Sequence, residues 1–268
     1  MSGWRWLKKT AGFLLLGLAL YIVFLAVTAP AALLAEAATR FSGGMLSVTA
    51  PNGTLWRGEG DVYAGGQATS VHHLGRLHWQ INPFWLLLGR AHFALQLQGA
   101  GTQGQASVQL SRSQVTVTEL KAALPASLAS LVYAPVGFFG PTGTLQLRAP
   151  NFDLSRGGLV TTTEVLWQGA GGRFAGATGL GDYRLELNGR GETATIRLST
   201  LNGNLELTGE GQWRVTGDGE LQFTGSALPR GDTARLEPLL QTLGRDLGGG
   251  RRELRLNARV PVVRQLGL

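Results

Sequence analysis

The stretch AHFALQLQGAGTQGQASVQLSRSQVTVT, residues 91–118, decides the fold of this chain. It contains three runs in which apolar and polar residues alternate, HFALQLQ (92–98), SVQLS (107–111) and QVTVT (114–118). Such alternation predicts half-buried strands, with aliphatic side chains on one face and polar side chains on the other. The glycine-rich segment 99–104 separates the first two runs, as expected for a hairpin turn. The stretch therefore predicts an antiparallel meander.

The same alternation continues through the rest of the chain, in RLELN (184–188), TIRLS (195–199), NLELT (204–208) and ELRLNARV (253–260). Turn residues between these runs are expected at Asn188-Gly189, at Asn202-Gly203 and at residues 217–219. Two segments have helical spacing instead, 120–132 and 233–247, and Pro125 and Pro238 are expected near their starts. We expect a mainly β fold with few short helices.

The N-terminus predicts a membrane anchor. Arg5, Lys8 and Lys9 precede an uncharged run of nineteen residues, 11–29, and eleven of these are Leu, Ile, Val or Phe. The run is long enough to span a bilayer, and the eleven residues contribute roughly −3 to −7 kcal/mol to insertion. The basic flank orients residues 1–10 toward the cytoplasm and everything after the helix toward the other side.

A cleaved signal peptide is the alternative, because small residues suitable for cleavage occur at Val27 and Ala29 and again at Ala35 and Ala37. The length of the apolar run and the following Pro30 favour an uncleaved anchor. Residues 30–43 are expected to form a juxtamembrane linker with a short helix, in which Glu36 and Arg40 are spaced i, i+4.

Charge and cysteine content narrow the possible partners. The formal net charge is +7, and residues 1–10 carry three of these charges, which leaves +4 beyond the anchor. A basic chain can bind nucleic acid, but the predicted topology argues against that partner and for a solvated or lipid-headgroup-facing surface. The chain has no cysteine, so neither disulfides nor thiol chemistry is available.

An internal repeat predicts two similar units. GTLWRGEGDVYAGG (53–66) and EVLWQGAGGRFAG (164–176) superimpose with an offset of 111 residues, and each is followed by alternating runs and a helical segment. Two β-meander-plus-helix units, 44–140 and 141–268, would each bury an apolar face against the other. The boundary is expected near residues 140–143.

The candidate site residues lie in this repeat and in the apolar run NPFWLLLG (82–89). In the repeat, tryptophan next to glycine on a strand favours a structural role over a ligand site, because the ring can cover the glycine. The run 82–89 is either a buried helical turn that caps the core or an exposed patch that contacts a membrane or a partner. The candidates are Trp56, Gly58, Gly60, Trp79, Pro83, Phe84, Trp85, Leu86, Trp167, Gly169 and Gly171.

No pattern in the sequence indicates catalysis. Residues 99–104 match G-x-G-x-x-G, but a strand follows where a dinucleotide site needs a helix. The four histidines, at 72, 73, 78 and 92, have no cysteine or helical H-x-x-x-H spacing to complete a metal site. G-x-S-x-G, S-x-x-K and H-E-x-x-H are absent. We expect no enzyme activity, no metal and no cofactor.

Five features in this order resemble one known family, the type II secretion system protein N, or general secretion pathway protein N. They are the basic N-terminus with one anchor helix, GTLWRGEGDVYAGG (53–66), GRLHWQINPFWLLLGRAHFALQLQG (75–99), VLWQGAGGRF (165–174) and LEPLLQTLGRDLGGGRRELRLNARV (236–260). The similarity covers essentially the whole chain.

The resemblance implies an accessory inner-membrane subunit of the machinery that exports folded proteins from the periplasm of Gram-negative cells. Its main domain would be periplasmic, its partners would be other secretion subunits, and the family has no catalytic residues to carry over. The segment from Trp79 to Gly89 also looks like pieces of AsmA-like proteins. The alternative function is therefore a lipid- or hydrophobe-binding β groove at the inner membrane, formed if the aliphatic strand faces stay open.

Overall fold

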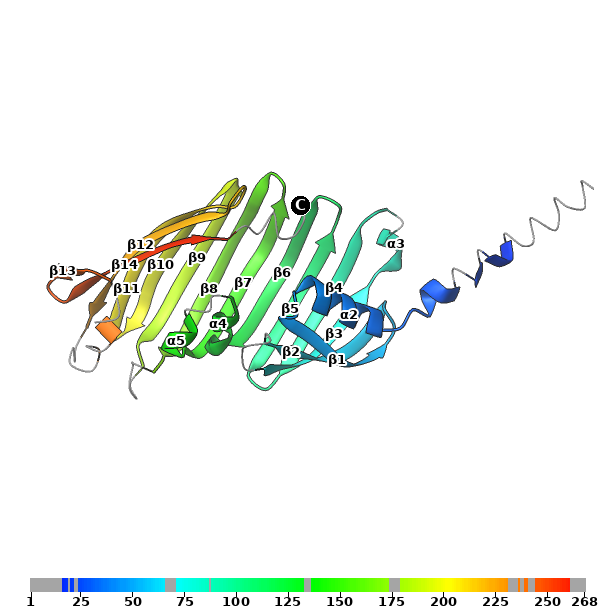
Figure 1. Ribbon diagram of the computed structural model, residues 1–268, viewed down its shortest axis with the longest axis horizontal. Coiled ribbons are helices and arrows are strands. Elements are labelled where there is room, and N and C mark those ends of the chain that lie inside the picture. Colours follow the sequence, from blue (N-terminus) through cyan, green and yellow to red (C-terminus); the bar gives the residue numbers. More distant parts are fainter. Residues whose placement is uncertain are drawn as a thin grey trace, which may run out of the picture.

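The computed structural model describes residues 16–18, 20–21, 24–65, 71–86, 88–132, 136–173, 179–230, 236, 239–240 and 244–260. These residues form one antiparallel sheet of fourteen strands, with short helices along one edge and over one end (Figure 1). The mainly β meander predicted from the alternating runs is confirmed.

Each strand pairs with the next one in sequence, except that β14 lies between β12 and β13. The strands are β1 (Leu46–Gly53), β2 (Arg57–Ala64), β3 (His72–Ile81), β4 (Ala91–Gly99), β5 (Thr102–Leu110), β6 (Gln114–Pro125), β7 (Thr142–Ser155), β8 (Gly158–Gly171), β9 (Gly181–Gly191), β10 (Thr193–Gly203), β11 (Leu205–Arg214), β12 (Glu220–Pro229), β13 (Asp246–Gly248) and β14 (Arg251–Arg259). The helices are α2 (Ala32–Phe41), α3 (Pro83–Leu86), the 3-10 turn η1 (Ala126–Leu128), α4 (Ala129–Val132) and α5 (Val136–Phe139).

Two of the four predicted turns lie at hairpins, at residues 99–104 and 217–219, and a third, Asn202-Gly203, forms the last two residues of β10, directly before the β10–β11 connection. The fourth prediction was wrong, because Asn188-Gly189 lies inside β9. The reason is packing: a Cβ added at Gly189 would lie 2.7 Å from the carbonyl oxygen of Leu159 and 2.8 Å from its Cγ. The glycine is there for a close approach between two strands, and the chain turns two residues later.

The helix predicted over residues 30–40 is confirmed as α2, where Arg40 and Glu36 form the expected ion pair. The helix predicted over 120–132 was wrong in its first half. There Leu120, Ala122 and Leu124 alternate in β6 and face Ala149, Leu147 and Leu145 of β7, and helical turns begin only after Pro125. Of the helix predicted over 233–247, residues 236, 239 and 240 are helical and 246–247 belong to β13; the other predicted positions at 233–235, 237–238 and 241–243 lie outside the described residues.

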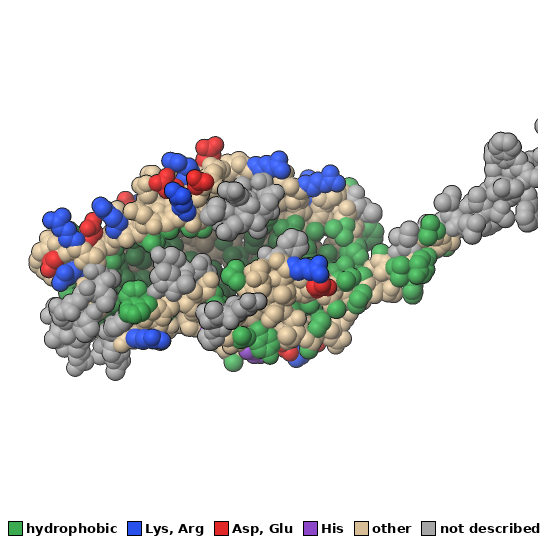
Figure 2. All heavy atoms as spheres, viewed as in Figure 1, with side chains coloured by type: hydrophobic (Ala, Val, Ile, Leu, Met, Phe, Trp, Pro, Cys, Tyr) green, Lys and Arg blue, Asp and Glu red, His purple; other side chains and the backbone are tan. Residues whose placement is uncertain are grey.

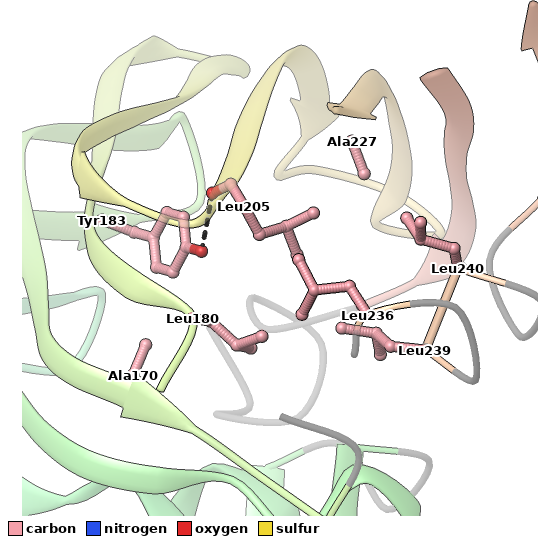
Figure 3. Close-up of a cluster of buried hydrophobic side chains, with 8 residues drawn as sticks. All are labelled: Ala170, Leu180, Tyr183, Leu205, Ala227, Leu236, Leu239 and Leu240. Atoms are coloured by element: carbon pink, nitrogen blue, oxygen red, sulfur yellow. Dashed lines mark hydrogen bonds between the residues drawn. The ribbon is translucent and has the colours of Figure 1, made fainter. Parts of the chain in front are cut away.

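Three clusters of buried side chains stabilise the described sheet. The first packs α2 on β1–β4 around Trp79, and the second joins Leu154 of β7 to Val215 after β11. The third packs three leucines near the C-terminus against β8–β12 (Figure 3). Its buried residues are Ala170, Leu180, Tyr183, Leu205, Ala227, Leu236, Leu239 and Leu240.

Tyr183 supplies the polar contact of this last cluster. It is only 2% exposed, and its hydroxyl donates to the carbonyl oxygen of Leu205 at 2.8 Å (Figure 3). The β10–β11 ladder ends at the pair Leu198–Gly209, so no strand neighbour in β10 reaches that carbonyl. Burial raises the pKa of the Tyr183 hydroxyl, and the nearby Asp182 carboxylate raises it further.

The sheet passes through residues 140–143 without a break, because β7 pairs with β6 from Pro125–Thr144 to Gln114–Ser155 and with β8 on its other side. The structure therefore does not show two separate units, and the division at 140–143 stays a prediction. Among the described residues, no helix is long and apolar enough to cross a membrane. Residues 1–15 and several positions of the predicted anchor, 11–29, lie outside the description.

Candidate functional site

The first copy of the tryptophan–glycine repeat builds the packing around Trp79. Trp79 is 2% exposed, and a Cβ added at Gly58 would lie 2.5 Å from its ring and 2.6 Å from the carbonyl oxygen of Asn52. A Cβ at Gly60 would lie 2.6 Å from a methyl group of Val48. Both glycines thus let neighbouring side chains and backbone approach β2 closely.

Trp56 has a different role from Trp79, because it fastens the N-terminal segment to the sheet. Its indole nitrogen donates to the carbonyl oxygen of Ala26 at 2.7 Å, and its own carbonyl accepts from the backbone N–H of Ile81. Pro30 and Thr54 form an isolated bridge beside this contact. Residues 26–30 are therefore held at the turn between β1 and β2.

The second copy of the repeat lies at the end of β8 and makes a comparable contact. The Trp167 indole donates to the carbonyl oxygen of Thr142 at 2.8 Å, and its ring lies 5.9 Å from that of Tyr183. Gly169 has φ +58, and its N–H donates to Asp182. A Cβ at Gly171 would lie 2.6 Å from Thr142 Oγ1. The repeated residues thus occupy packing positions in both copies.

The apolar run 82–89 forms the tip between β3 and β4. Asn82 begins the helix α3 by accepting the N–H of Phe84 on its side-chain oxygen at 3.1 Å. The buried alternative for this run was wrong: Phe84 is 75% exposed and Leu88 71%, and Trp85 and Leu86 are exposed as well. Within the described part of the chain, these side chains at the strand tip are left largely uncovered.

Two of the four histidines, His73 and His78 of β3, lie near carboxylates of β2. His78 Nδ1 lies 3.3 Å from Glu59, and His73 Nε2 lies 3.8 Å from Asp61, with its ring 4.8 Å from that of Tyr63 and tilted by 41°. Within the part of the chain that the structure describes, no group of three or more His, Asp or Glu side chains is placed to hold a metal ion.

The register of the strands reveals a feature that the separate runs could not: one face of the sheet is apolar from β3 to β14. Leu97 faces Gly104, Val108 faces Val117, Leu147 faces Val165, and Val165 faces Leu185, so aliphatic residues continue from strand to strand. We call this surface the apolar face. Figure 2 shows it as a hollow whose floor is hydrophobic.

The opposite face is polar and carries the ion pairs Arg184–Glu164 (2.8 Å) and Arg197–Glu210 (3.2 Å). A depression of about 680 Å³ reaches this face between β4 and β7. Amides and two cations contribute to its lining, at Gln96, Gln98, Gln103, Gln105, Gln146, Lys121 and Arg148.

Arginine recurs at successive connections along one edge of the sheet. We call the edge with the β3–β4, β5–β6, β7–β8, β9–β10 and β11–β12 connections and the end of β14 the upper rim. Each of these six places carries one exposed arginine, namely Arg90, Arg112, Arg156, Arg190, Arg214 and Arg259. In Figure 2 basic side chains, with acidic ones among them, follow the upper edge of the hollow. On the opposite edge the β4–β5, β6–β7 and β10–β11 connections contain no charged residue, whereas the β8–β9 connection contains Arg173 and the β12–β13 connection contains Arg230 and Arg245.

Sequence reasoning did not identify this arginine rim. The signal was present, because one arginine stands at or beside each of these connections. However, only the direction of each strand shows that the six arginines share an edge. The turn predicted at Asn188-Gly189 would also have placed Arg190 at the start of the next strand, whereas it lies at the end of β9.

Taken together, the fold and this surface define a class: a single-sheet antiparallel β protein with one extended apolar face. The comparisons with known proteins then give the family. The chain belongs to the family described as type II secretion system (T2SS), protein N, whose model matches residues 45–255. Neither the comparison with curated proteins nor that with solved structures found a match.

The match runs from the residue before β1 into β14 and so includes nearly the whole sheet. The protein is therefore a component of the type II secretion system, whose components are generally associated with the inner membrane of Gram-negative cells. The family is one of secretion components and is not a known enzyme family. The resemblance stated from the sequence is confirmed.

Proposed function

We propose that this protein is an accessory inner-membrane subunit of the type II secretion machinery and acts by binding other subunits. The family match over residues 45–255 carries this proposal. In the proposed topology, residues 11–29 span the inner membrane, residues 1–10 are cytoplasmic, and the sheet lies in the periplasm. The attachment of residues 26–30 to the β1–β2 turn supports a short, firm link between anchor and sheet.

The free edge of β14 is the surface that suits a protein partner best. β13 pairs with β14 only at Arg251 and Arg252, so from Leu254 onward no described strand covers the outer side of β14. An exposed strand edge offers backbone donors and acceptors to a strand of another protein. The other edge is less suitable, because β1 contains Pro51 and a bulge between Thr49 and Asn52.

The partner is tested by isolating the tagged full chain from membranes and identifying the proteins recovered with it. We expect other type II secretion subunits. Recovery of none of them, together with unchanged release of exported proteins from a deletion strain, would refute the proposed function.

The edge is tested by placing a photo-crosslinking residue at Asn257 of β14 and, as a matched control, at Gln96 in the middle of the polar face. Both positions are exposed and lie on strands. We expect an adduct with a secretion subunit from position 257 and none from position 96. Equal adducts from both would show that the strand edge is not the contact.

The topology is tested with single cysteines, since the chain has none of its own. Ser113, in the β5–β6 turn, and Ser2 are replaced by cysteine in turn. A membrane-impermeant maleimide added to spheroplasts is expected to label position 113 only. Labelling of position 2 instead would reverse the proposed orientation.

The family match does not support replacing the secretion role with that of an AsmA-like protein. The apolar face nevertheless raises the question of which molecule covers it.

A further inference from the structure

We propose that the apolar face binds anionic phospholipid, with acyl chains along the floor of the hollow and headgroup phosphates at the arginine rim. This inference stands on the sheet itself and does not depend on which secretion subunit the protein contacts.

The middle of the apolar face lacks the cover that its ends have. Near the upper rim Leu154 and Leu159 are at most 1% exposed, and near the lower edge Ala170 and Tyr183 are at most 2% exposed. Between these ends the side chains are only half-buried. They include Leu97, Val108, Val117, Leu147, Val165 and Leu185. Within the described residues, none of these six belongs to a buried cluster.

The size of this strip suits hydrocarbon chains. From β4 to β12 there are eight strand spacings, so the strip is about 38 Å long at about 4.8 Å per spacing. One leaflet of a bilayer has a hydrocarbon depth of about 15 Å, half of the whole core. The strip is therefore long enough for the acyl chains of more than one lipid. Contiguous apolar surface of this extent in a soluble domain marks a binding site.

The arginine rim gives the reason for an anionic headgroup. Successive arginines are two strands apart, or about 10 Å, along this edge. Arg90, Arg112 and Arg156 lie in the connections, whereas Arg190, Arg214 and Arg259 lie at strand positions that alternate with the apolar face. Arg214 lies 3.6 Å from Glu220, whereas among the described residues Arg90, Arg112, Arg156, Arg190 and Arg259 form no ion pair. Exposed guanidinium groups without a carboxylate partner are suited to phosphate, which they bind with two parallel hydrogen bonds.

One end of the hollow continues into exposed apolar residues. The β3–β4 tip exposes Phe84 and Leu88, and the N-terminal segment held by Trp56 exposes Phe24, Leu25 and Val27. Ile81, just before the tip, donates its N–H to the carbonyl oxygen of Trp56, whose indole donates to Ala26. Trp56 thus links both groups to one end of the sheet, beside the segment predicted to enter the membrane, where lipid would have a short apolar path to the floor.

The test uses the full chain reconstituted in vesicles with phosphatidylglycerol that carries a photoreactive group on its acyl chain. After irradiation, modified residues are mapped by mass spectrometry. We expect adducts at Leu147, Val165 and Leu185, in addition to any in the predicted anchor. The polar-face neighbours Gln146, Glu164 and Glu186 are the matched controls on the same strands and should stay unmodified.

Adducts confined to residues 1–30, or equally frequent on the two faces, would overturn the proposal. An adduct of these floor positions with a protein segment in place of lipid would also overturn it.

The headgroup is tested with Arg90→Gln, Arg112→Gln and Arg156→Gln combined, because these three arginines lie in the connections between strands. We expect floor labelling by phosphatidylglycerol to fall about two- to fivefold per arginine, and labelling by a phosphatidylcholine probe to be unchanged. The control combines Lys121→Gln, Arg148→Gln and Arg255→Gln on the polar face, which removes the same charge and should have no effect. Equal labelling by both probes in the wild type, or equal losses in the two variants, would refute the role of the rim.

Discussion

Replacing Tyr183 by phenylalanine tests whether a side-chain hydrogen bond stabilises the sheet where the β10–β11 ladder has ended. The substitution removes only the hydroxyl that donates to the carbonyl oxygen of Leu205 at 2.8 Å. Tyr183 is 2% exposed, and Leu205 is 2% exposed as well. Water therefore cannot simply replace the lost donor.

Leaving a buried carbonyl without a donor costs about 1–3 kcal/mol. In a domain of this size, 1 kcal/mol lowers the melting temperature by about 2–4 °C, so Tyr183→Phe should lower it by roughly 2–12 °C. The matched control is Tyr63→Phe. Among the described residues the Tyr63 hydroxyl makes no hydrogen bond, although its ring packs on His73, and this variant should change the melting temperature little.

The pH dependence of the free energy of unfolding gives a second, independent test of the Tyr183 contribution. Because the pKa of Tyr183 is raised in the folded state, that state keeps a proton that the unfolded state releases above its own pKa of about 10. The contribution of Tyr183 is therefore complete below about pH 10. It decreases above that pH by up to about 1.4 kcal/mol per pH unit, until the folded pKa is passed. Tyr183→Phe lacks this term.

Urea unfolding of the full chain in nonionic detergent, followed by tryptophan fluorescence at pH 8 to 11, measures both effects. The stability gap between wild type and Tyr183→Phe should be about 1–3 kcal/mol at pH 8 and should narrow above pH 10. The reasoning is refuted if Tyr183→Phe and Tyr63→Phe have the same midpoint, or if the gap is constant with pH.

Three further substitutions test the packing. Gly58→Ala should destabilise the chain by about 1–3 kcal/mol, because its Cβ would clash with Trp79 and with the Asn52 carbonyl. At Gly104 the nearest atom to an added Cβ is 3.6 Å away, so Gly104→Ala should be nearly neutral. The urea midpoints of the two variants measure this difference. Leu154→Asn in the covered core should lower the free energy of unfolding by about 3 kcal/mol or more, and Leu147→Asn in the open strip by less than half of that. Equal losses in the two variants would show that the strip is covered. Desolvation raises the pKa of Asp153, but hydrogen bonds from Thr116, Asn151 and Gln114 together outweigh it, so the pKa is lowered in the folded state. The stability of wild type relative to Asp153→Asn should therefore decrease as pH falls below about 4. A constant difference from pH 6 to pH 3 would contradict this.

Much of the fold was readable from the sequence, because period-two alternation reports directly that one face of a strand is buried. The runs 92–98, 107–111 and 253–260 all lie in strands, and the glycine-rich turns between β4 and β5 and between β11 and β12 were predicted correctly. The errors came where local pattern and tertiary contact disagree. Leu120, Ala122 and Leu124 satisfy a helical spacing as well as an alternating one, and pairing with β7 selects the strand.

For the candidate site, the sequence predicted that the tryptophans of the repeat, Trp56 and Trp167, have a structural role beside glycines. The ring next to Gly58 is instead that of Trp79, and the indoles of Trp56 and Trp167 donate to the carbonyl oxygens of Ala26 and Thr142. It left two alternatives for Phe84 and Leu86, and the structure selects the exposed one. Exposure depends on what lies above a side chain, which spacing along one segment does not contain.

By itself the sequence determined that this is a β meander of the type II secretion protein N family, because alternation, turn residues and the order of motifs are properties of neighbouring residues. Only the tertiary structure decided that the apolar halves of all these strands join into one surface and that six arginines share one rim. Both features depend on strand register and direction, and each strand acquires these only when it pairs with its neighbours.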